Sequence, residues 1–414
     1  MPASVNFMNL PKLKVSDEPP YDALQAFCRI NHRAMEGRPG GPLSGLAFAA
    51  KDVLSVMGST VGNGHPEWLS HHEPDKFTSS IIVRLLDAGA DLVGKTICDE
   101  LCFSISGENW QWGSPINPQD PRRFTGGSSA GSGAATAAGL CDFALGTDCL
   151  GSVRVPSAYC GLLGIRPTYH RVPSDGEAPY CISMDVLGYM AREPEVFRRV
   201  APVMLGEDEK KVKPRKVYIA ADNFGVLDED VQKAFRPVID WVASQVGDAE
   251  EIEVAGGHIA DWIQTFRKFQ GWEVWESYGG WYNQYHPKIS KPVLERVLWT
   301  STITRNEYYE AFEQRKPIIA RIDEIVADGG ILLIPTASSV APLKSITEED
   351  MNRLRGQSMK SLVLSPLSGC PQVNIPLAEM EDVPLGISVI GARGTDTELC
   401  RFAADLVDAY RKQA

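Results

Sequence analysis

Reactive hydroxyls gather in one stretch of the sequence, residues 124–168, which is richer in Gly, Ser and Ala than any other part of the chain. It begins FTGGSSAGSGAATAAGL and continues to GTDCLGSVR, which places Ser128 and Ser152 about two dozen residues apart. Small residues at this density let backbone turns approach one another and leave amides able to face a ligand. Because Leu, Phe, Val and Ile are interleaved with them, the stretch predicts a packed site and not a flexible linker.

Ser129 offers one reading of the chemistry. Residues 127–131 fit G-x-S-x-G, the nucleophile elbow of α/β-hydrolases, in which Ser129 attacks and a later histidine is the base. An elbow follows a buried strand, but the preceding NPQDPRRFT holds prolines and charges that prevent one. None of the seven histidines stands in a distinctive setting. The elbow is therefore the alternative mechanism.

A second pattern, from Gly89 to Thr96, satisfies the phosphate-binding sequence G-x-x-x-x-G-K-T. A phosphate cradle needs a strand, a glycine-rich loop and then the N-terminus of a helix. Here the residues predict a helix, a glycine stop and then an apolar strand, so we do not expect nucleotide binding. His, Cys and carboxylate residues form no cluster at metal-ligand spacing, so the sequence predicts no cofactor and no metal.

Longer motifs extend over much of the chain. They are GGSSAGS (126–132), GTDCLGSVRVPSAYCGLLGIRPT (146–168), LAFAAKDVLSVMG (46–58), GENWQWGSPINP (107–118) and SGCPQVNIPL (368–377). Together they resemble the amidase signature family, and most of all its short indoleacetamide-hydrolase branch. The resemblance implies an amidase that forms an acyl-enzyme. It also implies an α/β fold in which a large mixed twisted β-sheet is sandwiched between α-helices, as a single domain over residues 1–414.

The resemblance assigns three catalytic residues. Lys51 matches the lysine of the family's K-D motif. Ser128 matches the serine that follows a cis peptide bond and bridges the lysine and the nucleophile. Ser152 matches the nucleophile. In this Ser-cisSer-Lys triad a neutral lysine takes the nucleophile's proton through the bridging serine. A free lysine has a pKa of about 10.4, which burial lowers. The neighbouring Asp52 would act in the opposite direction, so the sequence leaves the protonation state of Lys51 open.

The resemblance also assigns supporting roles. The oxyanion hole would consist of the amides of Cys149, Leu150 and Gly151, together with that of Ser152. Many family members have glycine where this chain has Leu150, which would narrow the site or alter the turn. The remaining assignments are Ser129, Thr147, Asp148 and Arg154 as supporting residues, with Asp148 and Arg154 as an ion pair bracing the turn, and Gly126 and Gly127 as substrate-binding residues.

Composition limits the partners. The net charge of −12 argues against nucleic acid and anionic membrane, since both demand basic patches. No apolar run approaches the roughly 18 residues of a membrane span, and the first residues do not read as a signal peptide. Nine cysteines without a C-x-x-C pair suit a reducing compartment. We therefore expect a cytoplasmic protein that acts on a small-molecule amide.

The elements that must position these residues follow from apolar periodicity. After an N-terminal extension (1–20), residues 21–38 predict a helix, and 46–56 a strand that carries Lys51 at its end. A charged break, 206–216, predicts a surface loop. Further strands are predicted near 91–96, 141–148, 216–224, 331–336 and 385–391, and further helices near 79–88, 132–140, 228–248, 258–286, 306–328 and 395–412.

Substrate information is sparse. Trp272, Trp275, Tyr278, Trp281 and Tyr282 form a dense aromatic cluster whose helical spacing indicates packing in the core or between two copies in a homodimer. Alternatively, these rings form a wall that binds an aryl group of the substrate. Together with the resemblance to indoleacetamide hydrolases, this alternative suggests an aromatic primary amide such as indole-3-acetamide as the substrate. Two other functions stay open: the amidase subunit of a tRNA-dependent amidotransferase, and a catalytically silent scaffold.

Overall fold

The computed structural model describes residues 16, 18–208 and 213–413. In this part of the chain a 10-stranded mixed sheet has the order β2-β1-β3-β5-β4-β9-β10-β8-β6-β7. The outer pairs are parallel, and the pairs from β3 across to β8 are antiparallel. The strands are β1 (Ala47–Lys51), β2 (Asp91–Thr96), β3 (Phe143–Thr147), β4 (Leu163–Arg166), β5 (Leu187–Ala191), β6 (Lys216–Ala220), β7 (Ala249–Ile252), β8 (Gly330–Pro335), β9 (Gln372–Met380) and β10 (Val383–Ile390).

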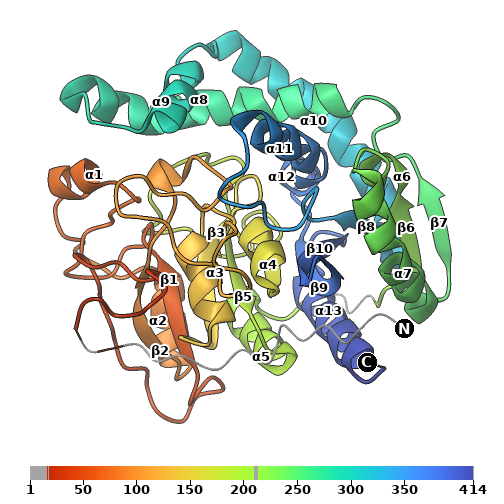
Figure 1. Ribbon diagram of the computed structural model, residues 1–414, viewed down its shortest axis with the longest axis horizontal. Helices are drawn as coiled ribbons and strands as arrows, with labels where there is room; N and C mark the ends of the chain where they lie inside the picture. Colours follow the sequence, from red (N-terminus) through yellow and green to blue (C-terminus); the bar gives the residue numbers. More distant parts are fainter. Residues whose placement is uncertain (1–15, 17, 209–212, 414) are drawn as a thin grey trace.

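Helices cover both faces of this sheet (Figure 1). The described helices are α1 (Pro66–His71), α2 (Ser80–Asp87), α3 (Ala130–Ala137), α4 (Arg154–Cys160), α5 (Pro194–Leu205), α6 (Ala221–Phe224), α7 (Glu229–Val246), α8 (Ile259–Tyr285), α9 (Lys291–Thr300), α10 (Arg305–Ile325), α11 (Glu348–Leu362), α12 (Leu364–Ser368) and α13 (Asp396–Arg411), with 3₁₀ turns η2 (Glu100–Cys102) and η3 (Ala327–Gly329). Apolar residues of α2, α5, α7 and α13 pack on one face. Those of α3, α4, α8, α9, α10 and α12 pack on the other. The predicted sandwich of a mixed sheet between helices is confirmed.

The phosphate-binding pattern does not form a cradle. Its residues run from Gly89, after α2, into the edge strand β2, in the predicted order of helix, glycine and strand. Lys95 points away from solvent and its Nζ lies 2.7 Å from Asp52 Oδ1 in a buried ion pair. Because β2 is hydrogen-bonded to β1 along its length, its amides already have strand partners.

The predicted helix over residues 21–38 is wrong. The Asp22 carboxylate accepts hydrogen bonds from the amides of Leu24, Ala26 and Phe27, which ties the start of the segment into a turn. Farther along, the amide of Met35 donates to Leu92 at 2.8 Å. The segment therefore follows the edge of β2, and this pairing competes successfully with its helical pattern.

Only part of the predicted surface loop 206–216 can be judged, since residues 209–212, like most of the N-terminal extension, lie outside the described residues. Asp208 is buried and accepts hydrogen bonds from the amides of Thr397 and Glu398 at the start of α13. At this point the segment is attached to the C-terminal helix. Among the described helices, none is both long and apolar enough to cross a membrane.

Candidate active site

Lys51 ends β1 and is fully buried. Its Nζ donates hydrogen bonds to Ser128 Oγ and to Thr147 Oγ1, each at 2.8 Å. β1 pairs in parallel with β3, which ends at Thr147, so the sheet itself aligns the lysine with the threonine. The chain turns away after Lys51, because the amides of Val53 and Leu54 both donate to its carbonyl oxygen. The sequence thus folds the lysine inward at a strand end.

Ser128 stands just before α3, and the peptide bond between Gly127 and Ser128 is cis. Its carbonyl oxygen accepts a hydrogen bond from the Asp99 amide at 3.1 Å. A Cβ atom at Gly127 would lie 2.2 Å from Asp99 Oδ2, so only glycine fits there. The serine hydroxyl is held toward Lys51 by this framework.

Ser152 lies in the turn between β3 and α4, and 7% of its surface is exposed. Its carbonyl oxygen accepts a hydrogen bond from the Ser129 amide at 3.1 Å, which links the turn to the start of α3. Ser152 lines the same cavity as Ser128 and Thr147. No hydrogen bond joins the Ser152 and Ser128 hydroxyls in the described residues; such catalytic contacts often tighten only in the substrate complex.

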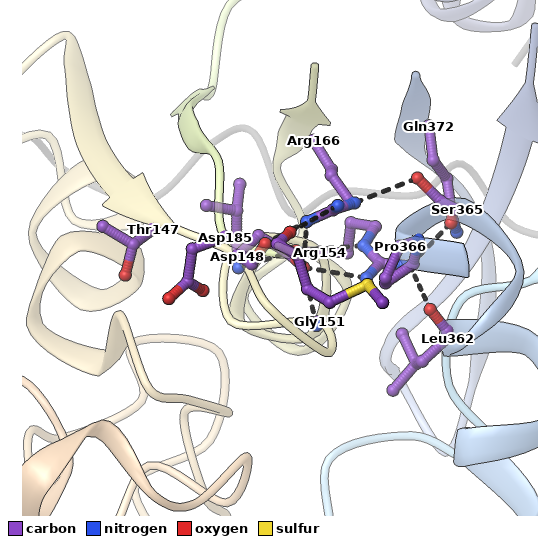
Figure 2. A network of polar contacts seen from close by, with 12 residues as sticks. Thr147, Asp148, Gly151, Arg154, Arg166, Asp185, Leu362, Ser365, Pro366 and Gln372 are labelled. Carbon is purple, nitrogen blue, oxygen red and sulfur yellow. Dashed lines mark hydrogen bonds and ion pairs between the residues drawn. The ribbon is translucent and has the colours of Figure 1, made fainter. Parts of the chain in front are cut away.

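Asp148 organises the turn that carries Ser152 (Figure 2). Its carboxylate makes a two-pronged contact with Arg154, at 2.8 Å to Nη2 and 2.9 Å to Nε, and both side chains are fully buried. It also accepts hydrogen bonds from the amides of Gly151 and Val153, at 2.7 and 3.1 Å. The predicted ion pair is present, and the same carboxylate shapes the backbone around Ser152.

The two arginines extend this network across the sheet (Figure 2). Arg154 Nη1 donates to Gln372 Oε1 on β9 at 2.6 Å and to the Leu362 carbonyl oxygen at the end of α11 at 3.1 Å. Arg166, at the end of β4, donates to the Asp148 carbonyl oxygen and to that of Met184. The turn is therefore fixed to elements from both halves of the chain.

The predicted oxyanion hole needs one correction. The Gly151 amide donates to Asp148 Oδ1 and is not available to a ligand. The amides of Cys149, Leu150 and Ser152 donate to no acceptor within the described residues. Gly151 is required for its backbone instead: its φ is +122°, and a Cβ atom would lie 2.9 Å from a Leu362 methyl carbon.

Gly126 and Gly127, which were predicted to bind substrate, lead into the cis peptide bond. Neither lines the cavity, and their amides donate to the carbonyl oxygens of Ser106 and Ile105, at 3.1 and 2.9 Å. These backbone contacts hold the approach to the cis peptide bond. The two glycines therefore serve the path of the chain into α3.

A small cavity brings the site together. Its lining residues are Val53, Asn63, Cys102, Ser128, Thr147, Cys149, Ser152, Glu177, Ala178, Tyr180, Asp185 and Tyr278. Its free volume is about 10 Å³, roughly the room that one water molecule needs. Five of these residues were not predicted from the sequence: Asn63, Cys102, Glu177, Tyr180 and Asp185. They stand in turns and irregular segments without periodicity, and only Asn63 and Cys102 lie near a quoted motif.

Charges near the cavity determine the protonation of Lys51. Burial lowers its pKa, but the thiols of Cys102 and Cys98 and the carboxylates of Asp185 and Asp99 raise it, and the net shift is upward. Asp52, which is paired with Lys95, is not among these groups. Burial raises the pKa of both Asp185 and Asp99 to about 7. The direction of this shift favours the cationic form of Lys51, and its neutral form becomes more abundant as the pH rises.

Ser129 is not placed as an elbow nucleophile. It is fully buried, its hydroxyl donates to the Thr147 carbonyl oxygen at 3.4 Å, and the residues before it form turns and not a strand. No histidine lines the cavity. Ser129 instead supports the turn through its amide contact with Ser152.

The aromatic cluster divides on α8. Tyr278 reaches the cavity, while Trp281 packs against Trp68 and Trp272 stacks on Tyr308. Trp275 lies beside Tyr282. The interpretation of these rings as packing residues fits all of them, and Tyr278, which is itself buried in the core, also lines the cavity. The cavity's aromatic wall consists of Tyr278 and Tyr180.

Comparison with known proteins gives the family. The profile of the family described as Amidase matches residues 11–242. The chain belongs to the amidase signature family. A crystal structure described as that of an amidase superposes with a TM-score of 0.80 at 26% identity, covering 89% of this chain and 85% of that one. The amidase fold predicted from the motifs is thereby confirmed.

Two plant relatives show how the family varies. Amidase 1 of Oryza sativa subsp. japonica is 32% identical over 401 residues, which cover 90% of this chain and 92% of that protein. The chloroplastic Outer envelope protein 64 of Arabidopsis thaliana is 34% identical over 395 residues, which cover 88% of this chain. The match spans only 66% of that protein's length.

Proposed function

We propose that this chain is a serine amidohydrolase that cleaves a carboxylic amide through an ester on Ser152. The observation that carries the proposal is the hydrogen bond of 2.8 Å from Lys51 Nζ to Ser128 Oγ, beside the cavity that Ser152 lines. A cluster of this kind has no evident structural purpose. A buried lysine is costly to maintain, and here its ammonium group is directed at a serine hydroxyl that lines the cavity.

In the proposed reaction, neutral Lys51 takes a proton from the Ser128 hydroxyl, which takes the proton of Ser152. The Ser152 oxygen attacks the carbonyl carbon, and the amides of Cys149, Leu150 and Ser152 donate to the developing oxyanion. The proton returns from Lys51 through Ser128 to the leaving nitrogen, and the C–N bond breaks. Water then hydrolyses the Ser152 ester by the same relay, which releases the carboxylate and regenerates the serine.

For the substrate, we propose an aromatic primary amide such as indole-3-acetamide. Tyr180 and Tyr278 support it as an aromatic wall of the cavity. It also agrees with the resemblance of the sequence motifs to the indoleacetamide-hydrolase branch. The free volume of about 10 Å³ means that the cavity must open before such an acyl group enters. Aryl, aliphatic and dipeptide amides, assayed side by side by ammonia or amine release, would test both the class and the acyl preference.

A fluorophosphonate probe tests the nucleophile. We expect its mass on the peptide that contains Ser152, and no adduct in the Ser152→Ala variant. An adduct on Ser129 would establish the elbow mechanism instead. A protein that neither reacts with the probe nor hydrolyses any amide in the panel would contradict the proposed function.

Two other functions predict different experimental results. A binding or scaffold role is the second candidate, because the chain is also similar to Outer envelope protein 64, whose name is not that of an amidase. Failure of both assays above would support this role. An amidotransferase subunit would copurify with a partner that holds tRNA. The net charge of −12 disfavours that role. We propose that the protein works in the cytoplasm on a small molecule. A homodimer that packs through the aromatic residues of α8 is a further possibility, and light scattering would measure the oligomeric state.

A further inference from the structure

Asn63 carries a buried polar atom that the reaction as described does not use. The residue is fully buried and lines the cavity with Ser128 and Ser152. Its Oδ1 atom has no hydrogen-bond partner among the described residues. Because a buried acceptor without a partner is unfavourable, an atom of this kind inside a reaction cavity points to a donor on the ligand.

Tyr278 fixes the orientation of the Asn63 amide. The single hydroxyl proton of Tyr278 is donated to the Leu101 carbonyl oxygen at 3.0 Å. The hydroxyl can therefore only accept from Asn63, whose Nδ2 lies 3.1 Å away. The NH₂ group of Asn63 faces the tyrosine, and Oδ1 is left for the cavity.

The backbone of Asn63 places it on the lysine side of the site. Its amide donates to the Asp52 carbonyl oxygen at 3.0 Å, directly after Lys51 in the chain. Its own carbonyl oxygen accepts from the Leu101 amide at 3.0 Å. Its φ is +48°, a left-handed conformation that Asn tolerates better than most residues. The backbone of Asn63 is thus joined to the chain directly after Lys51, while its side chain belongs to the lining of the cavity that Ser128 and Ser152 share.

The leaving nitrogen must come within reach of Ser128, because Lys51 returns the proton to it through that hydroxyl, and Ser128 and Asn63 line the same small cavity. We infer that Asn63 Oδ1 accepts a hydrogen bond from the N–H of the scissile carboxamide and so selects amides over esters. The inference rests on the proposed amidohydrolase function and adds a specificity-determining residue to it. An ester has no such hydrogen and would leave Oδ1 buried without a partner.

The experiment compares a primary amide with the methyl ester of the same acid, each with the native protein and with Asn63→Gly. Glycine suits the left-handed backbone at this position. We expect the amide-to-ester ratio of kcat/KM to fall by about tenfold in the variant, the effect of one hydrogen bond. The difference in intrinsic reactivity between ester and amide cancels, because the native protein and the variant are assayed with the same two substrates.

Asn223→Ala is the matched control. Asn223 is also buried and its Oδ1 also has no partner among the described residues, but its Nδ2 donates to Lys360 and it does not line the cavity. Its substitution should leave the ratio unchanged. If Asn63→Gly fails to fold by circular dichroism, Tyr278→Phe replaces it, because losing the hydroxyl frees the Asn63 amide to rotate, and the ratio should again fall.

The results separate the two levels of the argument. The amide is chosen from those that the native protein hydrolyses in the panel above; if it hydrolyses none of them and does not react with the probe, the proposed function fails. If it hydrolyses the amide but the ratio is the same in the folded variant, the function stands and the inference is overturned. Equal losses on amide and ester would likewise overturn it, since they would show that Asn63 contacts the acyl group or only the fold.

Discussion

Lys51 must lose a proton before it can act as a base, and the groups around it oppose that loss. The net effect of burial and of the nearby thiols and carboxylates raises its pKa. Only the small neutral fraction reacts at neutral pH, and this fraction grows about tenfold per pH unit below the pKa. In the proposed mechanism, turnover should therefore increase toward alkaline pH.

We therefore expect kcat/KM to rise from pH 7 into the mildly alkaline range with a slope of about one on a logarithmic scale. Lys51→Ala should lower the rate by about 10³-fold or more and flatten the slope, with the melting curve showing that the fold is kept. Substitution of the seven histidines, one at a time, serves as the comparison. A folded histidine variant with a comparable loss would mean that the base has been misassigned.

Asp185 allows a test of the electrostatics. Its carboxyl has a pKa raised to about 7 and, when ionised, it raises the pKa of Lys51. Asp185→Asn should thus lower the pKa of Lys51 and increase kcat/KM above pH 7. Below that pH the native carboxyl is protonated, so the two profiles should converge. Asp240→Asn, on the exposed face of α7, should leave the profile unchanged; equal profiles for Asp185→Asn would contradict the assignment.

At the scale of elements, the turn between β3 and α4 depends on one carboxylate. Burial raises the pKa of Asp148, but the charges of Arg154 and Arg166 and hydrogen bonds from Arg154 and the turn hold it well below its usual range. A depressed carboxyl pKa stabilises the fold above the unfolded value of about 3.9, and that stability is lost as the pH falls through the folded value. The turn should therefore stay intact through mildly acidic pH.

Asp148→Asn should lower the free energy of unfolding by about 3–5 kcal/mol, because it leaves two buried arginines without their anion. Urea denaturation at pH 7 measures this. Asp240→Asn, on the surface, should change stability by less than about 0.5 kcal/mol. A small loss in Asp148→Asn would show that Gln372 and the backbone carbonyls already compensate Arg154.

The sequence predicted elements where a local pattern agrees with the final environment. The apolar run before Lys51 became β1, and the small residues after Ser129 became α3. Residues 21–38 failed because their pairing with β2 is a contact between distant segments that no periodicity records. For the same reason Asp185 and Glu177 were missed: they reach the cavity from irregular chain between β4 and β5.

At the scale of the whole molecule, the side-chain contacts indicate whether amide hydrolysis should need a metal ion or a nucleotide. The described residues contain no group of three or more His, Cys, Asp or Glu side chains able to hold a metal ion. Lys95, the lysine of the phosphate-binding pattern, is bound to Asp52. We expect amide hydrolysis to be unchanged by EDTA and by ATP. Activity that is lost on chelation and restored by a metal would defeat this expectation.

The hydrogen bonds from Arg154 to Leu362 and Gln372 affect when the turn can form during translation. Lys51, Ser128 and Ser152 all leave the ribosome early, but the residues that anchor the nucleophile's turn follow some 210 to 220 positions later. At the usual rate of translation this interval lasts roughly 10–40 s. During that time the nascent chain carries its serines without the completed turn. In the proposed mechanism, the turn that carries Ser152 is therefore completed only after the chain up to Gln372 has been made.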